Sequence, residues 1–253
     1  MQIARLALAA AALAALPATA VLMRADRDDA EYLELATRYR ACVPLAHEGE
    51  GVLVASRWVL TSARVANGLR ELKKALPPIT FAGTEHEIQA IYSEGGVGLV
   101  LLRKPVTGVA PILLYRAGDE SGKTVVFVGY GPHGKIGDAA TAADRKARAA
   151  INTIDRVTAR AFALEVKAPD DASDLQGALA AGEDGAAAIL ETRDGLFVAG
   201  IATGRERANA ALTAPGDRDV YARVSAYVGW IEGVMLAVGA KEAAELLGDG
   251  DRR

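Results

Sequence analysis

The chain contains little cysteine and little histidine. Cys42 is the one cysteine among 253 residues, and there are three histidines. A single cysteine excludes an internal disulfide, even in an oxidising compartment. Stability must therefore come from burial of a core, and this length allows one large all-β domain or two small ones. We expect Cys42 to be a small buried hydrophobic residue rather than a reactive thiol.

Basic residues are not in excess. The chain carries 29 Lys and Arg against 32 Asp and Glu, a net charge of −3. Residues 1–20 hold one basic and no acidic residue, which leaves 28 basic against 32 acidic residues, a net charge of −4, in the remainder. Mild acidity favours solubility and disfavours contact with a phosphate backbone. We therefore expect no nucleic acid partner.

Long apolar runs are absent after residue 20. Residues 1–20 begin with one charge, Arg5, continue with a short apolar run, and end in Ala18-Thr19-Ala20. This pattern is typical of a secretory signal peptide, with cleavage after Ala20. The apolar run, of roughly eleven residues, is too short to favour spanning a bilayer of about 30 Å. We expect a secreted or periplasmic protein with no stable membrane insertion after cleavage; an uncleaved N-terminal anchor is the alternative.

Short β-type segments recur along the rest of the chain. Residues 52–55 and 58–61 are rich in β-branched and apolar residues and are separated by a polar turn at Ser56-Arg57. Residues 99–102 are predicted to form a fully buried strand, ended by Pro105. A short helix is predicted before them, near residues 30–39, with Asp28 or Asp29 as its cap. Further strands are predicted within 81–92, 122–131, 151–158, 160–166, 188–192 and 196–201.

Two other patterns indicate no cofactor or metal. The Gly-x-Gly at residues 129–131 lacks the third glycine and the helix of a dinucleotide-binding motif. The acidic turn at residues 169–174 lacks the ligand spacing and final glutamate of a calcium-binding loop. The charged loop at residues 132–148 is interpreted as solvated surface. We expect no cofactor and no metal site.

Five segments together resemble those of the trypsin-like serine peptidases, in the same order. Residues 58–61 read W-V-L-T, as before that family's catalytic histidine, and residues 99–106 keep an apolar frame ending in P-V. Residues 122–131 resemble the strand that opens its second barrel. Residues 182–185 read G-E-D-G where the family has G-D-S-G, and residues 219–231 resemble the start of its C-terminal helix.

The resemblance implies a fold and a domain organisation. It implies an all-β fold of two antiparallel six-stranded β-barrels of the chymotrypsin/trypsin type, followed by a C-terminal helix. The corresponding ranges are a signal peptide at 1–20 and a peptidase-homology domain at 21–253. Within that domain, barrel one covers about 40–115, barrel two about 120–218, and the helix about 219–238.

The resemblance also assigns the site, and each catalytic position is substituted. The positions of the histidine, aspartate and serine are Arg64, Gly96 and Asp184. Arginine stays protonated and cannot act as a base, glycine has no side chain to orient one, and aspartate is a poor nucleophile towards an amide. The oxyanion-hole positions are Gly182 and Asp184, and the specificity-pocket position is Ala178. No catalytic residue of the triad is intact.

Two ion pairs follow from the same alignment. Arg64 and Asp184 would face each other where histidine and serine meet, so we predict that they form an ion pair; the alternative is that both are solvated. Family members bury a new N-terminal Ile or Val against the acid before the nucleophile. Here cleavage after Ala20 would expose Val21, and Glu183 occupies the acid position, although the usual Gly-Gly does not follow Val21.

These observations leave three functional readings. The first is an exported pseudoprotease that binds protein or peptide in the inter-barrel cleft without cutting it. The second is an active but divergent serine-type endopeptidase with an unorthodox site. The third is a degenerate paralogue without a partner. We expect surface or structural roles for the three histidines, His47, His86 and His133.

Overall fold

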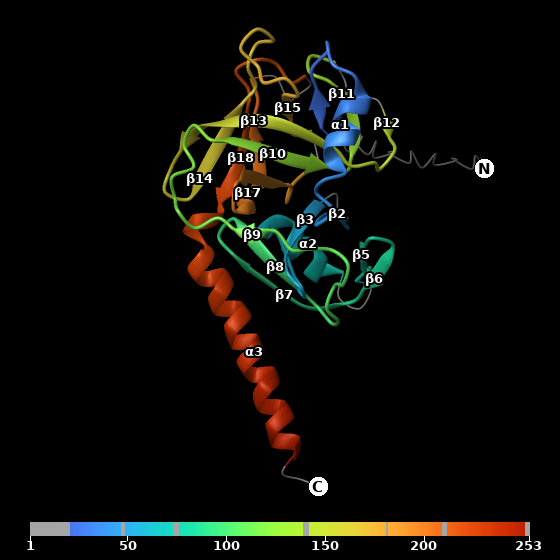
Figure 1. Cartoon of the computed structure of the whole chain (residues 1–253), viewed down its shortest axis with the longest axis vertical. Helices are drawn as coiled ribbons and strands as arrows, with labels where there is room; N and C mark the ends of the chain where they lie inside the picture. The colour runs from blue at the N-terminus through green and yellow to red at the C-terminus, as the bar shows by residue number, and fades with distance from the viewer. Residues whose placement is uncertain are drawn as a thin grey trace, which may run out of the picture.

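The computed structural model describes residues 21–46, 49–72, 76–138, 142–180, 182–208 and 212–250. The predicted signal peptide, residues 1–20, and His47 lie outside these ranges. The described chain is mostly β, with one long helix at its C-terminal end (Figure 1). Its strands form two main β units, a small N-terminal sheet and a separate two-stranded hairpin.

The first β unit is an open antiparallel sheet in the order β2-β3-β4-β8-β7. The strands are β2 (Cys42–Leu45), β3 (Gly49–Ala55), β4 (Trp58–Ser62), β7 (Ile88–Glu94) and β8 (Val97–Leu102). A hairpin of β5 (Ile79–Phe81) and β6 (Thr84–His86) pairs separately. Among the described residues this unit is not closed, so the six-stranded barrel predicted for 40–115 is not seen as such. The predicted turn at Ser56-Arg57 is confirmed between β3 and β4.

The second β unit is a closed barrel of six antiparallel strands, in the order β16-β10-β13-β14-β18-β17. These strands are β10 (Thr124–Gly129), β13 (Arg148–Val157), β14 (Ala161–Glu165), β16 (Ala187–Thr192), β17 (Gly195–Glu206) and β18 (Arg218–Arg223). Pairing of β16 with β17 closes the circle, which leaves few unpaired strand edges. β9 (Leu113–Leu114), in the connection between the units, adds to β17 in parallel.

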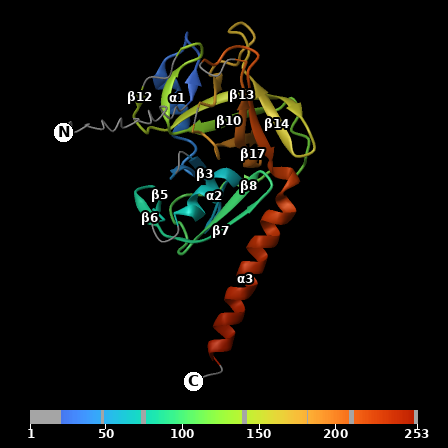
Figure 2. The same cartoon turned by 180° about the vertical axis from the view of Figure 1, so that it is seen from behind.

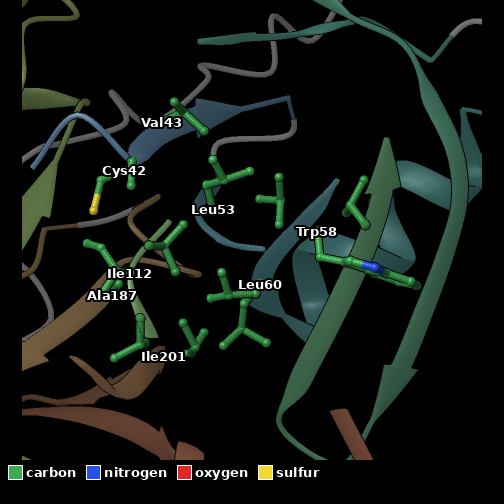
Figure 3. Close-up of a cluster of buried hydrophobic side chains, with 14 of the residues drawn as sticks. Cys42, Val43, Leu53, Trp58, Leu60, Ile112, Ala187 and Ile201 are labelled. Carbon is green, nitrogen blue, oxygen red and sulfur yellow. The ribbon is translucent and has the colours of Figure 1, made fainter. Parts of the chain in front are cut away.

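One hydrophobic core joins the two β units. All six residues of β8 are buried, as predicted for a fully buried strand. Leu53 and Leu60 of the first unit belong to the same buried cluster as Ala187 and Ile201 of the barrel (Figure 3). Cys42 is also buried in it, as predicted, and burial raises the pKa of its thiol. Because this core is shared, the relative position of the two units is fixed by apolar packing.

The N-terminal segment is attached to the barrel by a buried arginine. Helix α1 (Asp29–Ala36) begins after Asp28, as predicted, and Asp28 N donates to Glu31 Oε1 (3.2 Å). Arg148 is 1% exposed and forms ion pairs with Asp29 (2.5 Å) and Asp144 (2.8 Å). The sequence placed Arg148 in a solvated loop, and this is corrected: two carboxylates compensate the burial of its charge.

A small sheet completes the N-terminal side. Its order is β12-β11-β1-β15. The strands are β1 (Leu22–Met23), β11 (Pro132–Lys135), β12 (Ala142–Ala143) and β15 (Gly177–Ala178). β1 is parallel to β11 and antiparallel to β15, so the residues that follow position 20 are held against the barrel.

The C-terminal helix differs in position from the prediction of 219–238. Residues Arg218–Arg223 are strand β18, hydrogen-bonded between β14 and β17. A 3-10 turn, η2 (Val224–Ala226), follows, and α3 runs from Val228 to Gly250. Figures 1 and 2 show α3 leaving the barrel and extending past the first unit. Arg57, in the β3–β4 turn, forms an ion pair with Glu242 of α3 (2.8 Å). No helix in the described part of the chain is long and apolar enough to cross a membrane.

Candidate functional site

Arg64 lies at the start of the helix that follows β4. Helix α2 (Ala63–Glu71) is capped by Ser62, whose Oγ accepts a hydrogen bond from Val65 N (3.2 Å). Serine at this position satisfies one of the free backbone donors of the first turn. The cap places Arg64 in that turn, with its side chain 56% exposed.

Gly96 lies beside this turn but leaves no room for a side chain. Gly96 O accepts a hydrogen bond from Ala63 N (3.1 Å), next to Arg64. A Cβ added at Gly96 would lie 2.8 Å from the Cβ of Ala222 in β18. Real Cβ atoms do not approach so closely, so a carboxylate side chain here would require Ala222 to move. Packing, as well as residue type, therefore excludes an orienting acid at this position.

Asp184 reaches the same point from the barrel. It lies between β15 and β16, where its carbonyl accepts a hydrogen bond from Glu50 N of β3 (2.9 Å). Its side chain forms an ion pair with Arg64 Nε. The predicted Arg64–Asp184 ion pair is therefore present. Because Arg64 is more than half exposed, we expect the pair to contribute at most about 1 kcal/mol to stability.

The three substituted positions thus lie together without triad chemistry. A serine triad needs a hydroxyl to attack and an imidazole to carry its proton. Here Arg64 supplies a guanidinium instead of an imidazole, and Asp184 has no hydroxyl to attack. His86 is buried in β6 against Phe81, and His133 lies in β11 near Asp144 (3.9 Å). Neither histidine lines the pocket beside Arg64.

A polar cavity of about 320 Å³ lies beside the ion pair. Its lining includes Gly182 and Asp184, the two positions that the resemblance assigns to an oxyanion hole. Ala178, the expected specificity-pocket residue, is fully buried in β15 and pairs with Leu22 instead. The complete lining is Arg64, Leu179, Ala180, Gly182, Glu183, Asp184, Thr203, Gly204 and Arg205. The wall of the cavity is therefore formed by residues that follow Ala178, by the end of β17 and by Arg64 of α2.

Two buried carboxyl groups belong to this region: Glu183, which lines the cavity, and Glu50, whose backbone N donates to Asp184 O. Glu50 is 4% exposed and its Oε1 accepts from Tyr130 N (2.7 Å). Glu183 is 2% exposed; its Oε2 accepts from Ala180 N (2.7 Å), while its Oε1 has no hydrogen-bond partner among the described residues. Burial raises the pKa of both carboxyls, and the charge of Glu50 further raises the pKa of Glu183. Glu50 could not be identified from its sequence pattern, because it lies in a glycine-rich stretch at the start of β3.

Val21 lies next to the unpartnered oxygen of Glu183. Its side chain is fully buried. A Cβ added at Gly129 would overlap Glu183 Oε1 and lie 2.9 Å from Val21 Cγ2, so both residues flank the same glycine. The resemblance predicts that Val21 lies against Glu183, and in the structure both residues lie beside Gly129. What lies before Val21 is outside the described residues.

A larger hollow lies elsewhere. It has a volume of about 550 Å³ and shares no residue with the cavity beside Arg64. Its lining comes from three segments: Arg38–Ala41, Gly108–Leu113 and Gly195–Leu196. It contains no acid, histidine or nucleophilic hydroxyl apart from the phenol of Tyr39. The described residues also contain no group of three or more His, Cys, Asp or Glu placed to hold a metal ion.

Comparison with known proteins gives no independent assignment. No protein-family model matches the chain, and no curated protein matches it. The closed six-stranded barrel and C-terminal helix are compatible with a chymotrypsin-like fold. Any functional conclusion must therefore come from the site itself.

Proposed function

We propose that this chain is an exported, catalytically inactive homologue of trypsin-like serine peptidases, which binds protein or peptide in the cleft between its two β units. The observation that carries the proposal is the Arg64–Asp184 ion pair. It joins the start of α2 to the loop before β16. At these two positions the trypsin-like serine peptidases would have a histidine and a serine. An ion pair at that point occupies the site while supplying neither base nor nucleophile.

The proposal includes the N-terminus. Removal of residues 1–20 leaves Val21 with a free ammonium group. Glu183 is a buried carboxyl with one unpartnered oxygen, and it flanks the same glycine as Val21. An adjacent ammonium would compensate the burial of an ionised Glu183, because a paired buried charge costs far less than a single one. Processing would thus set the charge state beneath the cleft.

Hydrolysis by the chain from Val21 to Arg253 tests the proposal. We expect no cleavage of denatured protein or of a mixed peptide library above the rate in buffer, because neither a base nor a nucleophile is present. We expect no cleavage by the Asp184→Ala variant either. Cleavage by the wild type that disappears in Asp184→Ala would overturn the proposal and favour the alternative, a divergent endopeptidase that uses Asp184.

A further inference from the structure

The cavity beside the ion pair contains a further cation. Arg205, near the end of β17, lines it together with Arg64, Glu183 and Asp184. No carboxylate among the described residues lies within 4 Å of the Arg205 guanidinium to form an ion pair. Desolvation, followed by repulsion from Arg207, lowers the pKa of Arg205. A guanidinium nevertheless stays charged at neutral pH.

The other charges of the cavity cancel. Arg64 is neutralised by Asp184 in the ion pair. Burial raises the pKa of the Glu183 carboxyl, which favours its neutral form. In the processed chain, the Val21 ammonium would neutralise it instead. With Glu183 neutral, or paired with the Val21 ammonium, the cavity carries a net charge of about +1, located at Arg205.

A second guanidinium, that of Arg207, lies behind the wall and is compensated by carboxylates. The Arg207 side chain is 9% exposed. It donates to Leu179 O (2.9 Å) and forms an ion pair with Asp219, and its Nε lies 4.0 Å from Asp217. Nε and Nη1 are buried without a hydrogen-bond partner in the part of the chain that the structure describes. Because these carboxylates compensate its charge, Arg207 adds no net charge to the cavity, and Arg205 is the cation of the lining for which the described residues offer no ion pair.

We propose that the cavity beside Arg64 and Asp184 binds a carboxylate group of a bound peptide, with Arg205 as its ion-pair partner. The inference rests on the proposed peptide-binding function and names the class of ligand that the cleft prefers. The carboxylate is either an acidic side chain or the C-terminal carboxylate of the peptide. A volume of about 320 Å³ and a polar lining suit such a group, whereas an apolar side chain would leave the polar lining unsatisfied.

Peptide arrays followed by affinity measurements test this inference. Labelled Val21–Arg253 is applied to arrays of short random peptides, one with amidated C-termini and one with free C-terminal carboxylates. The tightest binders are then synthesised in solution with each Asp or Glu replaced by Asn or Gln, or with the free C-terminus amidated. Affinities for these matched peptides are measured by fluorescence anisotropy with wild type, Arg205→Gln, Arg205→Glu and the control Arg103→Gln. Arg103 pairs with Glu87 at the surface and does not line the cavity.

The expected result is a preference for carboxylates that depends on Arg205. Removing the peptide's carboxylate should weaken binding to wild type and to Arg103→Gln by ~10- to 100-fold, the range expected for a charged hydrogen bond. In Arg205→Gln this difference should fall to within about twofold, and Arg205→Glu should prefer the uncharged peptide. The two arrays show whether the side chain or the C-terminus supplies the carboxylate.

Two other results would overturn the inference. The inference would be wrong if the peptides bound equally well without their carboxylate, or if the preference for the carboxylate persisted in Arg205→Gln. Either result would leave the proposed peptide binding intact. If neither array yields a binder, both the inference and the proposed function fail.

Discussion

Replacing Gly185 by alanine is expected to reduce the free energy of unfolding by roughly 3–5 kcal/mol. Gly185 has φ +94° and lies between Asp184 and the start of the barrel strand β16. A Cβ there would overlap the backbone O of Glu50 and lie 2.5 Å from Thr61 Oγ1. The substitution therefore destabilises the protein in two ways: alanine is strained at this positive φ, and its Cβ clashes with the backbone of β3 where the two β units meet. Urea unfolding followed by circular dichroism measures the loss.

Gly216→Ala is the matched control. Gly216 has φ +91°, but a Cβ there would meet no atom within 4 Å. It shares the strain of Gly185 without the clash, so we expect a loss of only about 1–2 kcal/mol. Equal losses in the two variants would show that the contact of residues 184–185 with Glu50 and Thr61 contributes nothing to holding the units together.

Glu183→Gln is expected to change stability in opposite directions in two forms of the chain. In a chain that carries residues before Val21, Glu183 has no ammonium partner, and burial raises the pKa of its carboxyl. The neutral amide should then stabilise the protein by about 1–2 kcal/mol at pH 7. In a chain that begins at Val21, the same substitution leaves a buried ammonium unpaired, and we expect a loss of about 3–5 kcal/mol.

The pH dependence of the extended chain follows from the same group. A carboxyl whose pKa is raised on folding binds a proton in the native state that the unfolded state has released. The native state is therefore favoured fully below the unfolded pKa of about 4.3, and stability falls as pH rises from there towards the folded pKa. Glu183→Gln should flatten this decline. Urea unfolding at several pH values measures the stability change caused by Glu183→Gln and its dependence on pH. If Glu183→Gln changed the free energy of unfolding in the same direction in both chain forms, the pairing of Val21 with Glu183 would be contradicted.

The sequence predicted the elements whose pattern is local. The strands at Trp58 and Leu99 follow from apolar and β-branched residues between turns, and all of β8 is buried as expected. Closure of the barrel and the shared core could be expected only because five segments resemble those of the trypsin-like serine peptidases and occur in the same order. The first unit's open sheet could not, because strand pairing between distant segments leaves no local signal.

The site could be predicted only in part, because some of its residues have no local sequence signal. Arg64, Gly96 and Asp184 were placed by alignment, and the structure brings them together. Glu50 and Arg148 were missed, because charged residues are normally exposed and only their tertiary partners make burial possible. Ala178, predicted to line a specificity pocket, lies in the small sheet with β1 and does not line the cavity.

Restoring the triad tests the central claim most directly. The variant carries Arg64→His, Gly96→Asp and Asp184→Ser, with Ala222→Gly to make room at position 96. The release of p-nitrophenol from p-nitrophenyl acetate is measured, because acylation by this ester needs a nucleophile and base but no particular peptide. The account predicts a burst of p-nitrophenol from this variant. It predicts none from wild type, and none when Asp184→Ala replaces Asp184→Ser in the variant. A folded variant with no burst above wild type would contradict the claim that these positions are the remains of a serine peptidase site.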